Sequence, residues 1–169
     1  MSGTDPKAIP LDQLIALFRK LGAPDPESWA KSQDSEGIDQ LARFVFLRAA
    51  WGTVVPPDDA EWIDRIVQHD AAGSTKPCGG LGPALQRLLA AGADRTDIHD
   101  VVRVMQYEVL FSLCYLLGDP GEVEPELADI AWRLVRVDDD GQVVGPIDAL
   151  HESLLETDPS GREMRPAPR

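Results

Sequence analysis

The chain has 169 residues, of which 29 are acidic and 16 basic, giving a formal net charge of −13. This length and the 43% content of hydrophobic residues suffice for a buried core, which argues against disorder throughout. The excess of acids argues against nucleic acid or anionic lipid as the main ligand, because both are bound by clustered Lys and Arg.

Hydrophobic spacing predicts five helices before residue 119. The first covers residues 11–21, with Gly22 just past its end, and the second covers about 35–51 after a Pro-rich turn anchored by Trp29. Three more are predicted between Pro57 and Gly73, from Pro83 to Gly92, and from Asp94 to Gly118.

The C-terminal quarter combines a further helical stretch from Pro125, a β-hairpin at about residues 134–144 with an Asp-Gly turn, and a final helix over residues 146–156. Residues 157–169 are rich in Pro and Arg and are predicted to form a disordered tail, with folding back onto the acidic surface as the alternative. The predicted fold is therefore mainly α: a single helical domain over residues 1–156, with six or seven helices and a small C-terminal hairpin.

The helix that ends at Gly118 is predicted to be the axis of the core, because 14 of the 20 residues from Ile98 to Leu117 are apolar. At about 100° per residue, His99, Arg103 and Gln106 fall on one stripe, while Glu108 falls on roughly the opposite side among Val101, Val104 and Tyr115. Glu108 is therefore the candidate for a buried charge, either paired with an Arg or lining a pocket.

No catalytic or ligand motif is matched. Each of the three histidines is followed by an acid, but neighbours on a helix point about 100° apart, so no metal site is predicted. The run from Asp138 to Gly141 lacks oxygen ligands at the first and twelfth positions of a calcium loop. The Gly-rich loop of residues 73–82 lacks a P-loop ending and does not fit the dinucleotide fingerprint, and Cys78 within it has no identifiable base. No cofactor is expected.

The compartment is predicted to be the cytoplasm. The first ten residues lack the basic start and apolar run of a signal peptide, and the apolar stretch from Val104 to Leu117 is shorter than a bilayer span. No membrane association is expected, and the two cysteines do not indicate a disulfide.

Acidic residues are densest between Gly118 and Asp140, and that density carries the leading hypothesis of function. We expect a small protein-interaction module, of inhibitor, immunity or adaptor type, that presents an acidic face to a basic protein partner. The candidate partner-binding residues are Asp119, Glu122, Glu124, Glu126, Asp129, Asp138, Asp139 and Asp140.

Two alternatives remain open at this point. One is a small enzyme or ligand-binding protein whose pocket contains Glu108, His99 and Arg103. The other is a homo-oligomer formed through exposed apolar helix faces. The enzyme or ligand-binding protein is the less favoured class, because the helical projection places Glu108 opposite His99 and Arg103.

Overall fold

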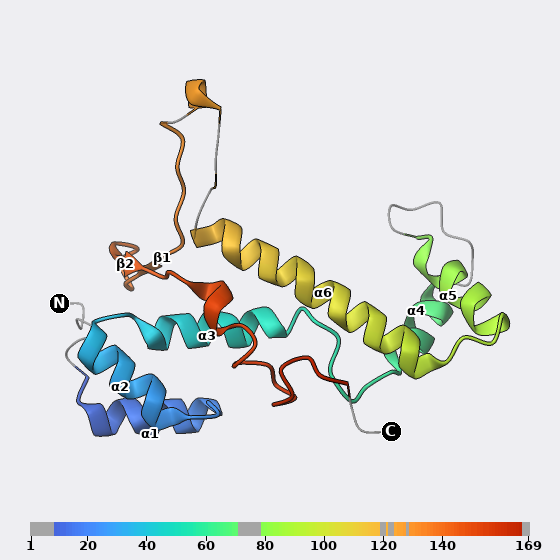
Figure 1. Cartoon of the computed structure of the whole chain (residues 1–169), viewed down its shortest axis with the longest axis horizontal. Helices are drawn as coiled ribbons and strands as arrows, with labels where there is room; N and C mark the ends of the chain where they lie inside the picture. Colours follow the sequence, from blue (N-terminus) through green and yellow to red (C-terminus); the bar gives the residue numbers. More distant parts are fainter. Residues whose placement is uncertain (1–8, 71–78, 119–120, 122–123, 128, 167–169) are drawn as a thin grey trace. The chain divides into compact units, whose positions relative to one another are not determined.

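The computed structural model describes residues 9–70, 79–118, 121, 124–127 and 129–166. They form six α-helices and a two-stranded antiparallel hairpin (Figure 1), which confirms the predicted mainly helical fold with a small C-terminal hairpin. The chain divides into two compact units, residues 1–51 with 109–169, and residues 52–108. Helix α6, Arg95–Gly118, contributes residues to both. The single domain over residues 1–156 stays a prediction.

Three helices open the first unit. α1 is Leu11–Leu21 and ends at Gly22, whose φ of 84° places it in the left-handed region that glycine adopts readily. α2 is Pro26–Glu36 and α3 is Gln40–Trp51. The prediction of one helix over residues 35–51 is therefore wrong for its first residues, and α2 was missed. Pro26 begins α2, and the Asp25 carboxylate accepts the backbone N–H of Ser28 at 3.0 Å.

The core of α1, α2 and α3 is aromatic. Phe18, Trp29 and Phe44 come one from each helix, and all three are buried. The rings of Trp29 and Phe44 meet edge to face with centroids 5.2 Å apart, and Phe18 meets Phe44 similarly at 5.8 Å. Edge-to-face packing fixes the helices at defined distances and adds to the hydrophobic gain.

The hairpin pairs β1, Val135–Val137, with β2, Val143–Pro146, as the sequence predicts. The helices expected on either side of it are not α-helices: Pro125–Leu127 and Leu150–Ser153 form short 3-10 turns. Ala149 has a φ of 54°, so the backbone leaves the helical region immediately before Leu150. The predicted helix over residues 146–156 is therefore wrong.

Contacts to α3 hold the segment after the hairpin in place. The indole N–H of Trp51 donates to the carbonyl oxygen of Leu154 and to the hydroxyl of Thr157, each at 3.1 Å. Beyond it, the buried carboxylate of Asp158 accepts from the backbone N–H and the hydroxyl of Ser160 and from the backbone N–H of Met164. The expectation of a disordered tail is wrong for residues 157–166, because Asp158 organises them as turns.

The second unit contains α4, Trp62–His69, α5, Leu81–Ala90, and the first part of α6. Its core is formed by buried Trp62, Ile63, Leu85 and Ile98. Most of the predicted Gly-rich loop, including Cys78, lies outside the described residues.

Candidate functional site

The polar stripe of α6 that the sequence singled out faces the protein: His99 and Arg103 are buried, and Gln106 is half-buried. Arg103 donates to the carbonyl oxygen of Val55 at 2.7 Å, and the side-chain oxygen of Gln106 accepts the backbone N–H of the same residue at 2.8 Å. His99 Nδ1 accepts the indole N–H of Trp62 at 3.0 Å. Because an indole nitrogen can only donate, this bond places the proton of neutral His99 on Nε2. The stripe therefore holds the segment between α3 and α4 against the helix.

This arrangement corrects the pocket expected around Glu108, His99 and Arg103. The projection correctly put His99, Arg103 and Gln106 on one side of the helix, but their polar groups bond to the protein's own chain. Glu108 is exposed, so the prediction of a buried carboxylate at this position is wrong. Its apolar neighbours Val101 and Val104 are exposed as well, which removes the burial that the prediction assumed.

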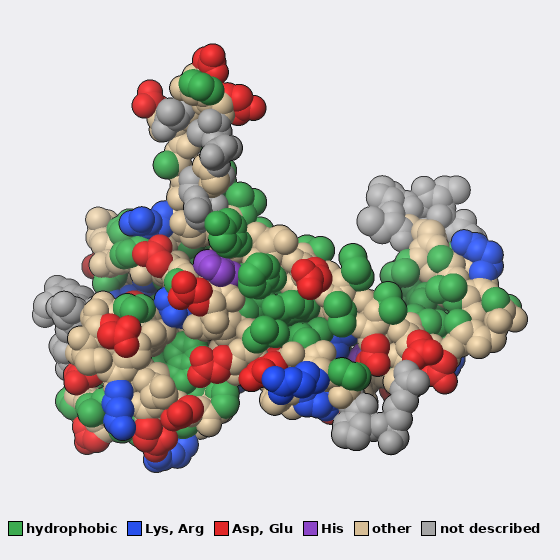
Figure 2. All heavy atoms as spheres, viewed as in Figure 1, with side chains coloured by type: hydrophobic (Ala, Val, Ile, Leu, Met, Phe, Trp, Pro, Cys, Tyr) green, Lys and Arg blue, Asp and Glu red, His purple; other side chains and the backbone are tan. Residues whose placement is uncertain are grey.

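The opposite side of α6 is apolar and exposed. In the second unit Val101 is 63% exposed, and Val104 and Met105 are exposed too; in the first unit Val109 is 66% exposed, and Leu113, Tyr115 and Leu116 follow. Figure 2 shows hydrophobic side chains gathered along this helix. We call the set Val101, Val104, Met105, Val109, Leu113 and Leu116 the apolar face of α6. Sequence reasoning found the apolar residues but assigned them to the core.

Aromatic groups lie beside the last turns of α6. The indole N–H of Trp132 donates to the carbonyl oxygen of Leu116 at 2.7 Å, and the Trp132 side chain is itself exposed. The ring of His151 lies 4.9 Å from that of Tyr115 and 5.8 Å from that of Phe111, centroid to centroid. No signal in the sequence pointed to these neighbours, because they are 16 to 40 positions apart along the chain.

The candidate partner-binding acids fall into three groups. Asp119 and Glu122 lie outside the described residues. Asp138 is half-buried, and its carboxylate accepts the backbone N–H groups of Asp140 and Gln142 at 3.0 and 2.8 Å, so it shapes the hairpin turn. The remaining acids are all exposed: Glu124, Glu126, Asp129, Asp139 and Asp140.

A groove of about 440 Å³ runs along α3, on the side away from its aromatic core, and we call it the α3 groove. Its lining includes an ion pair in which Arg136 Nε lies 2.8 Å from a carboxylate oxygen of Asp39. Apolar side chains form most of the wall, namely Leu41, Ala42, Val45, Phe46, Ala49 and Ile147.

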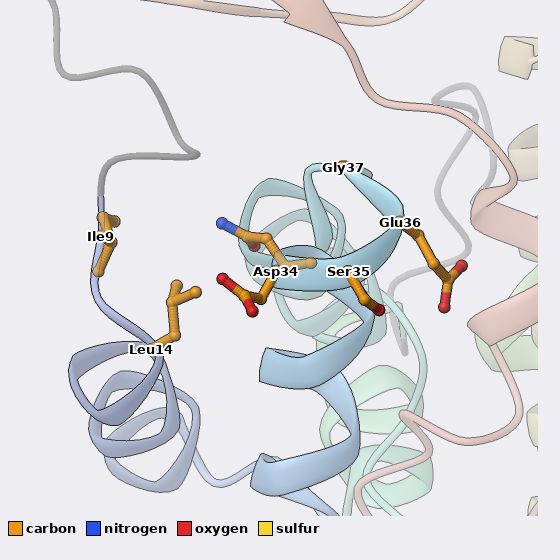
Figure 3. A pocket seen from close by; sticks show the side chains of 7 residues that line it. Ile9, Leu14, Asp34, Ser35, Glu36 and Gly37 are labelled. Carbon is orange, nitrogen blue, oxygen red and sulfur yellow. The ribbon is translucent and has the colours of Figure 1, made fainter.

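A smaller and more polar cavity of about 200 Å³ lies at the C-terminal end of α2 (Figure 3). Ile9 and Leu14 form one side, and the carboxylate of Asp34 faces them. Glu36 points away from it. One apolar side and one exposed carboxylate do not define a reaction, so this cavity carries no functional assignment.

Cys114 is buried on α6, and burial raises the pKa of its thiol to about 11. The thiol is therefore protonated at neutral pH. Among the described residues, no group of three His, Cys, Asp or Glu side chains is placed to hold a metal ion.

In the described part of the chain, α6 is long and apolar enough to cross a membrane, judged by length and composition alone. Only 17% of its most apolar stretch is buried. The same stretch carries Arg103 and Glu108.

Comparison of the chain with protein-family models, with curated proteins and with solved structures finds no match.

Proposed function

We propose that the protein is an interaction module that binds a basic, amphipathic segment of a partner protein along the apolar face of α6. The observation that carries this proposal is the exposure of a regular row of large apolar side chains on a helix whose opposite side is buried. Contiguous exposed apolar surface of this kind is typical of binding sites in proteins that otherwise cover their apolar groups.

The spacing of the face suits a helical or extended partner segment. Val101, Met105, Val109 and Leu113 follow one another at four-residue intervals, so they form one row along the helix. A partner that lays apolar side chains along such a row removes both surfaces from water, which supplies the main driving force for association.

The exposed acids on and after α6 indicate that the proposed partner is basic. Glu108 is exposed beside this apolar row, and Glu124, Glu126 and Asp129 are exposed in the segment that follows α6. The basic residues of the helix are engaged elsewhere, because Arg95 pairs with Asp64 at 2.6 Å and Arg103 is buried against Val55. Lys or Arg side chains flanking an apolar strip would complement this distribution and raise the rate of encounter.

Two other uses of the face are less favoured on the same grounds. Glu108 is close to the middle of the row, so an antiparallel pair of α6 helices from two copies would bring two carboxylates together, which opposes self-association at neutral pH. A bilayer with anionic lipids would meet a chain of net charge −13.

The test uses two synthetic amphipathic helices of equal length, one of Leu and Lys and one of Leu and Glu, each with a fluorescent label. Leu113→Ser removes an apolar group from the face, and Leu88→Ser on α5 is its control because the two leucines are 49% and 47% exposed. Fluorescence anisotropy should show that the wild type binds the Lys peptide more tightly than the Glu peptide and that rising salt weakens this binding. Leu113→Ser should lower the affinity severalfold, and Leu88→Ser should leave it unchanged.

Equal affinities of the two leucine variants would overturn the proposed site. Two further measurements separate the competing uses of the face: a dimer in sedimentation equilibrium that Leu113→Ser dissolves would favour self-association, and co-sedimentation with neutral phosphatidylcholine vesicles that the same variant abolishes would favour a membrane. Either result counts against a protein partner at this face.

A further inference from the structure

We propose that the α3 groove binds a small, mostly apolar carboxylic acid, with the guanidinium of Arg136 receiving the carboxylate. The site is separate from the apolar face of α6 and from the acids of the C-terminal segment. It lies within the first unit, where α3 and β1 supply its two kinds of surface.

α3 is apolar on two sides, and only one of them is used by the core. Phe44, Leu47 and Trp51 are buried on the core side. On the groove side, Val45 is 48% exposed and Ala49 is exposed too; Leu41 lies one turn before Val45, at the border with the aromatic core against which it also packs. A helix that buried only one side would place polar residues at these positions, so the second apolar side needs another occupant.

The size of the groove fits a small molecule. Its volume of about 440 Å³ falls within the roughly 300–1,000 Å³ that is typical of ligand pockets. Two of its wall residues, Ala42 and Ala49, are small, and their short side chains leave space beside Val45 and Phe46. An apolar chain or ring placed there would be removed from water on several sides.

Arg136 supplies the specific polar contact. A guanidinium has five N–H donors, yet within the described residues the Nε and Nη2 groups of Arg136 are buried without an aligned hydrogen bond. Nε lies 2.8 Å from Asp39, but the geometry makes this contact an ion pair only. Buried donors without acceptors are costly, so an acceptor that reached this guanidinium would be strongly held.

Asp39 is not free to turn and satisfy the guanidinium itself. Its other carboxylate oxygen accepts the backbone N–H of Ala42 at 3.1 Å and so caps the beginning of α3. The Arg136 side chain is 30% exposed and lines the groove, so part of it faces the space that a ligand would occupy, and a small shift of the ligand or the side chain brings an acceptor to the buried donors. A carboxylate has two acceptor oxygens that match the guanidinium fork.

The surrounding charge limits the ligand to a monoanion. Asp39 already offsets much of the charge of Arg136, and the whole chain carries −13. A phosphate monoester or a dicarboxylate would bring a second negative charge toward Asp39 with no cation to meet it. A ligand with a single carboxylate and an apolar body can pair with Arg136 and also contact the apolar walls of the α3 groove.

Isothermal titration calorimetry with three eight-carbon probes tests the proposal on the full chain. Octanoate, octan-1-ol and octylammonium share their apolar body and differ in the head group. We expect octanoate to bind most tightly, octan-1-ol about tenfold more weakly or worse, and octylammonium not measurably, because only the first offers acceptor oxygens with a negative charge.

Two substitutions should move the affinity for octanoate in opposite directions. Arg136→Met keeps an apolar stem and removes the cation, so binding should weaken about tenfold or more. Asp39→Asn keeps an oxygen that can cap α3 but removes the competing negative charge, so binding should tighten severalfold. Arg133→Met is the matched control, because Arg133 is exposed and lies 3.7 Å from Asp148 outside the groove.

Ala49→Phe fills the groove and should abolish octanoate binding without touching the ion pair. It also keeps the test decisive should Arg136→Met fail to fold. The proposal is overturned if octanoate does not bind, if octan-1-ol binds as well as octanoate, or if Asp39→Asn weakens binding while circular dichroism shows an intact fold. Leu113→Ser should bind octanoate like the wild type, which keeps this result independent of the partner site on α6.

Discussion

Replacing Gln106 by Ala should destabilise the second unit, because it removes the acceptor for a backbone N–H that has no other partner in the described contacts. Gln106 Oε1 receives the N–H of Val55 at 2.8 Å in a partly buried setting. An unsatisfied buried donor costs about 1–3 kcal/mol, and because this one is only partly buried, the free energy of unfolding should fall by about 1 kcal/mol. Gln106→Glu retains an acceptor oxygen and should stay close to the wild type.

Urea unfolding followed by circular dichroism measures this loss as a lower midpoint with an unchanged slope. Gln68→Ala is the control, since Gln68 is exposed on α4 in the same unit and Ala favours a helix at least as well as Gln. If Gln106→Ala unfolds with the midpoint of the wild type, or if Gln106→Glu is as unstable as Gln106→Ala, the hydrogen bond to Val55 does not hold this segment.

Three further predictions concern the first unit. In a Cys78→Ser background, Cys114 should not react with a thiol reagent at pH 8 in the folded protein but should react once urea unfolds it; fast reaction of the native form would contradict its burial. Because the pKa of Cys114 is raised from 9.0 to about 11, its contribution to stability is complete below pH 9 and is lost between pH 9 and 11, and Cys114→Ala should lack this loss. Trp51→Phe should cost about 1–3 kcal/mol, measured by urea unfolding, since it removes the donor to Leu154 and Thr157.

Sequence patterns correctly predicted the elements whose ends are set by neighbouring residues in the chain. Residues 11–21 form the predicted helix because apolar spacing and Gly22 agree, and the hairpin forms around the predicted Asp-Gly turn. The sequence also contains a signal for α2, since Asp25 is a capping residue and Pro26 a first-turn proline. Because Pro24 lies close by, this stretch was interpreted as a Pro-rich turn instead. The left-handed φ of Ala149, which prevents the last helix, has no such signal.

The burial of α6 could not be predicted from its own residues. The more apolar side of a helix is normally the inner one, and on that rule Glu108 was expected inside. The polar stripe faces the protein instead, because Val55 and Trp62 supply partners for Arg103, Gln106 and His99. These partners are 37 to 51 positions away in sequence. The same reversal exposes the apolar face and so creates the proposed binding site.

The α3 groove was missed for a related reason. Its walls come from a helix with two apolar sides, and its cation comes from a strand about 90 residues further along the chain. In the sequence, Arg136 lies near Arg133 in a segment rich in acids, and no local pattern marks it as a binding residue. Its ion pair with Asp39 depends on how the hairpin packs, which no local pattern encodes.

The central claim is that the apolar face of α6 binds a basic amphipathic segment, and a methyl NMR titration with the Leu and Lys peptide tests it most directly. The methyl groups of Val101, Val109 and Leu113 should shift as the peptide is added, while those of buried Leu14 and Leu85 should not. Shifts confined to residues away from α6, or no shifts at a peptide concentration that saturates the anisotropy signal, would contradict the proposed function.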